Sequence, residues 1–304
     1  MGYEIDSNRK EKEEGGNSIR KSYFKAESVV EYALPTCFFL FLPLFLLYGI
    51  FFVYPLVRLF PISCLEPTFT LEHYWHFFDE PLYATVLLRT FRVSLIVTIV
   101  CLIVGYPVAY VLANAEGKRL AIYIACVILP FWTSILVRNY AWIVILQRKG
   151  VLNTLLQWIG VINNPLRLLY SEPAVALGMI HFLLPLMILP IYSVLRGIDR
   201  NLELAAYNLG ARPWPAFLLV TLPLSLPGIG AGVSIVFIIG LGFFITPALL
   251  GGPKNLMIST LIERQVAVND WPFAAAGAFI LLFITMILIM IFHKIVSFEK
   301  MYGR

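Results

Sequence analysis

Charged residues are scarce in this sequence: Asp, Glu, Lys and Arg together make up 13% of its 304 residues. Soluble globular domains carry about 25% charged residues. Hydrophobic residues make up 60% of the chain, and its mean hydropathy is +0.82. The shortage of charge therefore excludes an ordinary soluble domain and indicates an integral membrane protein.

Cysteine is also rare, and the chain has four: Cys37, Cys64, Cys101 and Cys126. All except Cys64 fall within apolar stretches, and no pair has the spacing of metal ligands. We therefore expect no disulfide, and we interpret the cysteines as small apolar packing residues. His73 and His76 lie three residues apart, but no third ligand is near them, so we expect no metal site.

Motifs for nucleotide binding and for catalysis are missing. A P-loop needs a glycine five residues before its Gly-Lys pair and a hydroxyl after the lysine. Gly117-Lys118-Arg119 has neither, so this chain is not expected to bind ATP through such a loop. No convergent set of Ser, His and carboxylate residues, haem ligands or zinc ligands is visible either. The alternative of an integral-membrane enzyme therefore has no reactive residues to support it.

Long apolar stretches are what the sequence has in place of charge. A helix needs about 20 apolar residues to cross the hydrocarbon of a bilayer, and its backbone groups must pair within the helix. Six stretches are long enough: 34–57, 91–113, 120–146, 174–195, 223–250 and 272–295. The alternating short segments of a transmembrane barrel are not seen in the sequence. The predicted fold class is an all-α integral membrane protein with six transmembrane helices, which form a domain over 34–296.

The basic residues predict how the chain is oriented. Residues 1–33 form a polar tail of mixed charge that we expect to be disordered. If this tail is cytoplasmic, 14 of the 23 lysines and arginines fall in the tail, in the loops after the second and fourth spans, or after the last span. Because positive residues concentrate on the cytoplasmic side, this bias predicts that both termini and the loop 199–222 are cytoplasmic.

The loop 199–222 has the pattern of two short helices. Asp199 is placed to cap a first helix, and Gly210 is placed to end it because glycine readily takes a positive φ. Pro213 suits the first turn of a second helix. The apolar and small residues of the first helix recur at helical spacing: Leu202, Ala205, Ala206 and Leu209. Such a helical pair is either a docking element for another protein or a linker between spans.

The same loop carries a family resemblance. Its pairs Ala205-Ala206, Gly210-Ala211 and Leu222-Pro223 resemble the EAA loop of permease subunits in binding-protein-dependent, type I ABC importers. In that family the loop inserts into a cleft of the ATP-hydrolysing subunit and couples hydrolysis to opening of the pore. The resemblance implies coupling roles for five residues: Glu203, Ala205, Ala206, Gly210 and Ala211. The family's usual glutamate falls on Leu204, which lies one residue, or about 100° around a helix, from Glu203.

Further strings narrow the resemblance to the spermidine/putrescine branch of these permeases. They are Gly105–Ala113, Leu129–Trp142, Pro165–Ser171, Leu250–Pro253 and Asp270–Pro272. The branch also contains carriers of opines, phosphonates and other small solutes, so an importer of a small anion stays open as an alternative. A self-sufficient secondary transporter is the other alternative, although such proteins usually place ionisable residues or broken helices at mid-membrane.

The resemblance implies a multi-pass subunit of a bacterial inner membrane, surrounded by lipid and without nucleic-acid partners. It implies that this chain forms the solute pathway together with a homologous second permease. Two ATP-binding subunits would hydrolyse ATP with magnesium, so this chain itself would be no enzyme and would hold no cofactor. A periplasmic solute-binding protein would deliver the solute, which is spermidine, putrescine or a related small molecule.

Three neighbouring residues of the third span, Arg138, Asn139 and Tyr140, are candidates for the solute pathway, and so are Phe243 and Phe244 in the fifth. An arginine within a span is costly unless it is paired or hydrated. Arg138 lines the pathway in one interpretation and reaches the headgroups in the other. On the pathway its charge would suit an anionic solute better than a polyamine. The glycines of the fifth span indicate either gating movement or dense packing.

Two segments on the predicted outer side, 71–78 and 151–158, have the pattern of helices at the membrane surface. The acidic residues on that side are candidates for docking of a binding protein: Asp79, Glu80, Glu263 and Asp270. In the fourth span we expect His181 to be packed and hydrogen-bonded, because no carboxylate is available for a proton relay.

Overall fold

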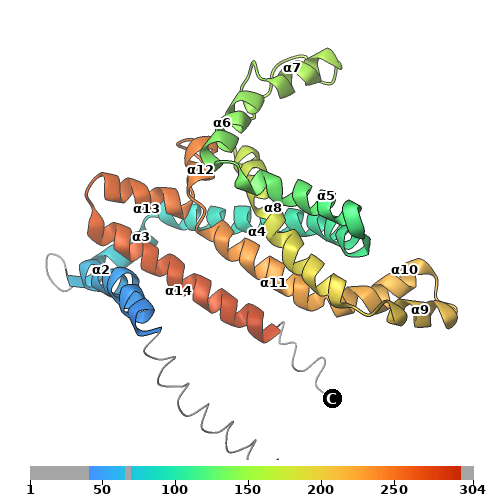
Figure 1. Ribbon diagram of the computed structural model, residues 1–304. Coiled ribbons are helices and arrows are strands. Elements are labelled where there is room, and N and C mark those ends of the chain that lie inside the picture. Colours follow the sequence, from blue (N-terminus) through green and yellow to red (C-terminus); the bar gives the residue numbers. More distant parts are fainter. Residues whose placement is uncertain (1–40, 66–69, 296–304) are drawn as a thin grey trace, which may run out of the picture. The chain divides into compact units, whose positions relative to one another are not determined.

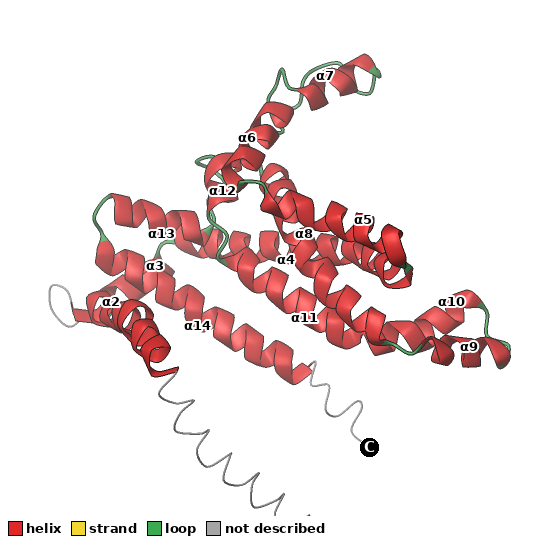
Figure 2. Ribbon diagram, in the orientation of Figure 1, coloured by secondary structure: helices red, strands yellow, loops and turns green. Residues whose placement is uncertain are grey.

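The computed structural model describes residues 41–65 and 70–295, and the predicted tail over 1–33 lies outside them. Every regular element in the described residues is a helix, as Figure 2 shows, so the all-α fold class is confirmed. The described residues fall into two compact units, with the boundary between Pro61 and Ile62. The first unit holds the π-helix η1 (Gly49–Val53) and most of α2 (Tyr54–Leu65).

In the part of the chain that the structure describes, five helices are long and apolar enough to cross a membrane, and the number is six if a bent pair counts as one span. The five are Phe41–Cys64, α4 (Pro81–Asn114), α8 (Glu172–Gly197), Pro213–Leu241 and α14 (Trp271–Ile295). The bent pair comprises Gly117–Trp132 and Ile135–Trp158. These helices agree with an integral membrane protein of five or six spans.

The third predicted span is not the continuous helix expected over 120–146. It consists of α5 (Gly117–Ile128), the 3-10 turn η2 (Leu129–Trp132) and α6 (Ile135–Leu146). The helices before and after the break meet at 90°. Pro130 has no N–H with which to continue the helix, and Thr133 adopts an extended backbone. The sequence prediction missed this break because apolar residues continue on both sides of it.

The fifth predicted span, 223–250, is also divided. It consists of α11 (Leu222–Leu241) and α12 (Ile245–Leu250), with a short break at 242–244. Towards its start the helix extends back beyond the prediction, because Pro213–Leu241 forms one apolar helix. This helix is made of α10 (Pro213–Ala216), the π-helical η3 (Phe217–Thr221) and α11. In the same way α4 begins before residue 91, at Pro81, because proline fits the first turn of a helix.

The core of the second unit is formed by α4, α8 and α11, which pack side by side (Figure 1). Glycines let these helices approach closely. A Cβ on Gly228 would lie 3.0 Å from the Cα of Ile191, and one on Gly232 would lie 2.9 Å from the sulfur of Met187. Met187 and Ile191 are fully buried. Dense packing therefore explains these two glycines of the fifth span, while gating movement stays a prediction.

Other, shorter helices lie outside this core: α3 (Glu72–Asp79), α7 (Val151–Trp158) and α13 (Ile258–Ala267). α7 packs against α6 and projects away from the core (Figure 1). The segments 71–78 and 151–158 are therefore helical, as the sequence predicts, while their placement at a membrane surface stays a prediction. α3 and α13 both pack against α14, around the buried rings of Phe77 and Phe273. This second cluster is apolar and aromatic, and it is separate from the main core.

Candidate functional site

The loop 199–222 contains one short helix, as its sequence predicts, and the start of a second helix, which is not short because it continues to Leu241. The Oδ1 of Asp199 accepts a 2.9 Å hydrogen bond from the backbone N–H of Asn201 and caps α9 (Arg200–Asn208). Gly210 follows the end of this helix with φ +88°, and α10 begins at Pro213. The predicted conformational roles of Asp199, Gly210 and Pro213 are therefore confirmed.

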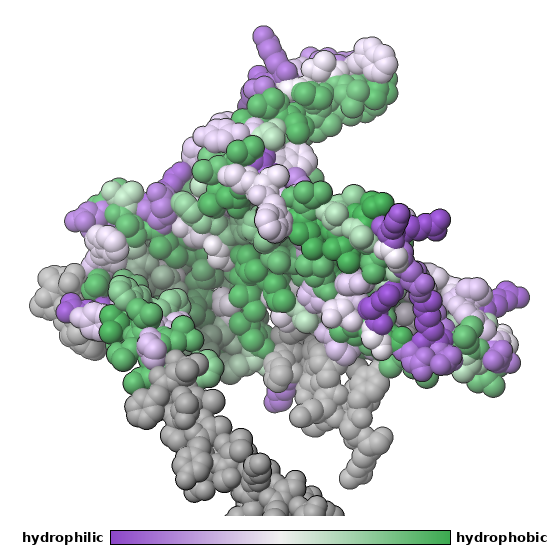
Figure 3. Space-filling view, viewed as in Figure 1, coloured by the Kyte–Doolittle hydropathy of each residue, from purple (hydrophilic) through white to green (hydrophobic). Residues whose placement is uncertain are grey.

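The loop exposes many apolar side chains. None of the residues of α9 is buried, and its Leu204 is 54% exposed. The other exposed large apolar side chains of the loop are Leu202, Tyr207, Leu209, Trp214, Leu218 and Leu219. Figure 3 shows apolar and hydrophilic side chains next to each other around α9 and α10. Exposed apolar residues rimmed by polar ones mark contact sites, so this surface favours a docking element over a linker.

Gly210 is explained by backbone conformation within this chain. A Cβ added to it would meet no other atom of the described residues within 4 Å, so the positive φ is what disfavours other residues there. Ala205 is exposed, and Ala206 and Ala211 are partly exposed. These positions are open to a partner, and their roles in coupling stay predictions.

Glu203 points into its own chain. Its Oε1 accepts a 2.6 Å hydrogen bond from the Oγ1 of Thr221, the last residue of η3, and Thr221 is 6% exposed. Leu204, which stands where the family's glutamate is expected, is exposed instead. The carboxylate of Glu203, a predicted coupling residue, therefore has an intramolecular partner. The sequence could not indicate this partner because the two residues lie 18 positions apart.

A cavity of about 450 Å³ lies beside α9. Its lining includes Tyr110, Glu116, Arg196, Arg200, Glu203 and Thr221. Arg196 donates to the carbonyls of Ala113 (2.9 Å) and Ala115 (3.0 Å) at the end of α4, where the helix dipole favours a cation. Arg200 of α9 pairs with Glu116 at 3.3 Å. The Arg200–Glu116 pair and the Glu203–Thr221 bond thus attach α9 to the rest of the chain.

The second candidate region lies at the break in the third predicted span. Arg138 of α6 is buried, and its Nη2 donates to the backbone carbonyls of Pro130 and Thr133 and to the Oγ1 of Thr133. Its guanidinium lies 5.5 Å over the ring of Phe182. Arg138 therefore closes the turn in its own span instead of extending outward. Its Nε and Nη1 have no hydrogen-bond acceptor in the described part of the chain.

The other pathway candidates divide into buried and exposed residues. Asn139 is buried and donates to a backbone carbonyl of its own helix at 2.9 Å. Phe243 is buried, with its ring 5.3 Å from that of Phe182. Two candidates are exposed: Tyr140 and Phe244. Phe182, which the sequence analysis did not single out, therefore contacts both the guanidinium of Arg138 and the ring of Phe243.

His181 of α8 has the environment predicted for a packed core residue. It is partly buried, and its ring accepts a hydrogen bond from the indole of Trp142 in α6. The prediction of a hydrogen-bonded histidine is confirmed.

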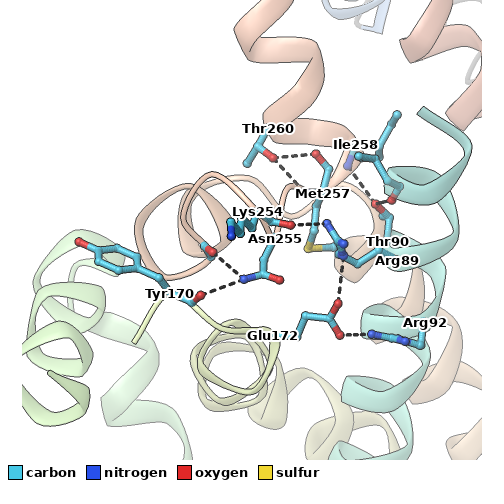
Figure 4. A network of polar contacts seen from close by, with 12 residues as sticks. Arg89, Thr90, Arg92, Tyr170, Glu172, Lys254, Asn255, Met257, Ile258 and Thr260 are labelled. Carbon is cyan, nitrogen blue, oxygen red and sulfur yellow. Dashed lines mark hydrogen bonds and ion pairs between the residues drawn. The ribbon is translucent and has the colours of Figure 1, made fainter. Parts of the chain in front are cut away.

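A polar network that the sequence analysis missed joins α4, α8 and the segment before α13 (Figure 4). Glu172, at the start of α8, binds both Arg89 and Arg92 of α4. Arg89 also donates to the backbone carbonyl of Lys254 at 2.7 Å. The one available signal was the spacing of the two arginines, which lie three residues apart and therefore on one face of a helix.

Comparison with known proteins identifies the family to which this chain belongs. Residues 32–297 match the family described as binding-protein-dependent transport system inner membrane component. This chain belongs to that family. The spermidine/putrescine transport system permease protein PotB of Escherichia coli strain K12 is 38% identical over 257 residues, which cover 84% of this chain and 92% of PotB. PotB of Haemophilus influenzae is 39% identical over 226 residues, which cover 74% of this chain and 79% of that protein.

A solved structure agrees at the level of the fold. A chain of the bacterial alginate ABC transporter, in complex with an alginate pentasaccharide-bound periplasmic protein, matches with a TM-score of 0.71. The match covers 91% of this chain and 98% of that chain, at 19% identity. The family match and the PotB relatives make this chain a multi-pass permease of an ABC importer, and the solved structure agrees with its fold. That assignment replaces the alternative of a secondary transporter.

In this permease the four acidic candidates for docking lie on neighbouring elements. Asp79 ends α3, Glu80 precedes α4, and Glu263 lies in α13, and all three are exposed. Asp270 caps α14 by accepting a 3.3 Å hydrogen bond from the backbone N–H of Phe273. Because α3 and α13 both pack against α14, these residues belong to one region of the second unit (Figure 1). Contact with a binding protein stays a prediction.

Proposed function

We propose that this chain is a permease subunit of a spermidine/putrescine importer. The observation that carries the proposal is its 38% identity to Escherichia coli PotB, which extends over most of both chains. A family relationship of this extent favours a shared class of solute. A related small polyamine is the nearest variation on this proposal.

The alternative solute, a small anion such as an opine or a phosphonate, drew its support from the charge of Arg138. That guanidinium is buried, and it donates to backbone and hydroxyl oxygens of the turn at Pro130 and Thr133. An arginine engaged in this way stabilises the turn of a broken span. Its charge is therefore no reason to expect an anionic solute, and the polyamine assignment is preferred.

The proposed assembly contains this chain, a homologous second permease, two ATP-binding subunits and a periplasmic solute-binding protein. ATP and magnesium belong to the ATP-binding subunits, and this chain is not an enzyme. Both termini and the loop 199–222, called the coupling loop from here on, face the cytoplasm. The bias of lysine and arginine supports this orientation, and the exposed apolar side chains of the coupling loop support its docking against a partner.

The proposed transmission depends on the helix that follows the coupling loop. Pro213–Leu241 is a single apolar helix, so a displacement of its first turn also displaces the span. Within the span, Gly228 and Gly232 bring this helix against α8 without room for a side chain. Movement of the loop would therefore shift two packed spans together, which is how closure of the ATP-binding subunits would open the pathway.

Uptake by the reconstituted complex tests the proposal. Proteoliposomes with internal ATP should accumulate labelled spermidine or putrescine only when this chain, the ATP-binding subunits and the binding protein are all present. Unlabelled phosphonate or opine should not compete. Competition by those anions without competition by spermidine would contradict the solute assignment. Uptake without ATP-binding subunits would contradict the assembly.

A further inference from the structure

The hydrogen bond between Glu203 and Thr221 links the coupling loop to the fifth-span helix within one chain. We propose that Glu203 is a positioning residue that fastens α9 to the start of this helix, and that it does not serve as a contact to the ATP-binding subunit. The inference rests on the proposed function and deepens it, because it states how movement of the loop reaches α11.

Apolar packing does little to hold α9 in place. None of its nine residues is buried, and a cavity of about 450 Å³, lined by residues of α4, α8 and η3, lies beside it. A helix this short has no stability of its own in water. The position of α9 therefore depends on polar contacts with the rest of the chain.

Among these polar contacts, the bond to Thr221 is the one most shielded from solvent. The Arg200–Glu116 pair is 61% and 68% exposed, and exposed ion pairs contribute little. Thr221 is buried, Glu203 is only partly exposed, and a hydroxyl that donates to a carboxylate at 2.6 Å makes a charge-assisted bond. It is therefore the strongest single tie between α9 and the span.

Thr221 also differs from other hydroxyl residues in the spans. Several of these donate to the carbonyl four residues earlier in their own helix: Thr85, Thr90, Thr98 and Ser234. Thr221 donates to Glu203 instead, and it ends the π-helical η3. Single π-helical turns occur frequently at functional sites. The Glu203–Thr221 hydrogen bond thus connects α9 to the irregular turn η3, from which α11 continues.

The one-residue offset from the family pattern fits this geometry. Glu203 and Leu204 lie about 100° apart around α9. Glu203 faces Thr221, whereas Leu204 is exposed. The coupling loop therefore presents an apolar side chain where the family's glutamate is expected, and its carboxylate acts within the chain.

Four single variants of the assembled transporter test this role. Thr221→Val removes the hydroxyl at nearly constant volume, and Thr221→Ser keeps it. Glu203→Leu removes the acceptor, and Glu203→Gln keeps an acceptor oxygen but removes the charge. The quantity to measure is the number of spermidine molecules transported per ATP hydrolysed, in complexes whose ATP-binding subunits co-purify.

We expect Thr221→Val and Glu203→Leu to lower this ratio about ten-fold, and Thr221→Ser and Glu203→Gln to stay within about two-fold of the unmodified transporter. The double variant Glu203→Leu/Thr221→Val should be no worse than either single variant, since both remove the same contact. Among the four single variants, hydrogen exchange of the α9 amides should be faster only in Thr221→Val and Glu203→Leu. This second readout remains informative where transport is lost.

A direct contact of Glu203 with the ATP-binding subunit predicts a different pattern. Glu203→Gln would then be as damaging as Glu203→Leu, and Thr221→Val would behave like the unmodified transporter because Thr221 is buried. That pattern, or unchanged hydrogen exchange of α9 in Thr221→Val, would overturn the inference. If the unmodified complex fails to transport polyamines, the proposed function fails instead, so the two failures are distinguishable.

Discussion

The Nε1 of Trp142 donates a 3.2 Å hydrogen bond to the Nδ1 of His181 and so joins α6, beyond the break in the third predicted span, to α8 in the core. The two rings meet edge-on, with centroids 6.0 Å apart. This bond fixes the neutral imidazole as the tautomer that carries its proton on Nε2. The pair therefore helps to orient a short helix that the sequence presents as part of a continuous span.

Trp142→Phe should reduce stability through this bond. Phenylalanine keeps an aromatic ring but has no N–H, so the Nδ1 of His181 loses its donor. We expect a loss of about 1 kcal/mol, seen as a lower unfolding temperature of the purified complex. Trp158→Phe is the matched control, because Trp158 is 84% exposed. Equal unfolding temperatures for the two variants would show that the bond contributes nothing.

Arg138→Lys should weaken the turn that divides the third predicted span. Lysine keeps the positive charge, but it cannot reproduce the donor geometry of the guanidinium over Pro130 and Thr133. We expect a stability loss of about 1–3 kcal/mol together with reduced uptake. Arg264→Lys, at an exposed position of α13, is the control. An Arg138→Lys variant as stable as this control would contradict the role of Arg138 in the turn.

Cysteine labelling tests the predicted topology. Asn269→Cys should react with a membrane-impermeant reagent added from the periplasmic side, and Asn208→Cys should react only after the membrane is opened. Both are made in a background with Cys126→Ser, because Cys126 is exposed, and with Cys37→Ser. The reverse labelling pattern would place the coupling loop on the outer side and would rule out its contact with an ATP-binding subunit.

Charge reversal tests where the binding protein docks. The residues to change together to lysine are Asp79, Glu80, Glu263 and Asp270. Rim charges mostly set the rate of association and its dependence on salt. Stimulation of ATP hydrolysis by the binding protein should therefore become slower, with a larger effect at low salt. Unchanged stimulation at low salt would place the docking surface elsewhere.

Local patterns predicted the coupling loop well, because its conformation depends on neighbouring residues. Asp199 caps the helix that follows it, and Gly210 takes the positive φ that ends this helix. Pro130 shows the limit of such patterns. It lies at a break, whereas α8 continues through Pro185 and Pro190. Arg138 donates to the turn at Pro130 and Thr133, and the apolar pattern of the span does not indicate these contacts.

The sequence patterns also did not predict hydrogen bonds and ion pairs between residues that lie far apart in the chain. Glu203 and Thr221 are 18 positions apart, and Arg89 and Glu172 are 83 apart. Composition and hydropathy locate the spans, since each span must satisfy its own backbone groups in lipid. They do not determine which polar side chains meet once the spans have packed.

Gly210→Val and Ala206→Trp should both abolish uptake while the chain still inserts into the membrane. At Gly210 the backbone has φ +88°, which a β-branched residue adopts only with strain, so valine should reshape the turn between α9 and α10. At Ala206, which is only partly exposed, the indole should displace the ATP-binding subunit that we propose to dock against the loop. In both variants the ATP-binding subunits should dissociate, or should hydrolyse ATP without transport.

Gly160→Val separates this effect from backbone strain in general. Gly160 has φ +78° and, like Gly210, has no atom of the chain's described part within 4 Å of an added Cβ, but it lies in a different loop. The same strain there should leave the ATP-binding subunits attached. A coupling loop that was only a solvated linker would tolerate bulk, so Gly210→Val and Ala206→Trp would then transport normally. Uptake and subunit retention, measured on the same membranes, distinguish the two cases. Normal values for both variants would refute the coupling assignment, because a docked helical turn cannot accept an indole without moving its partner.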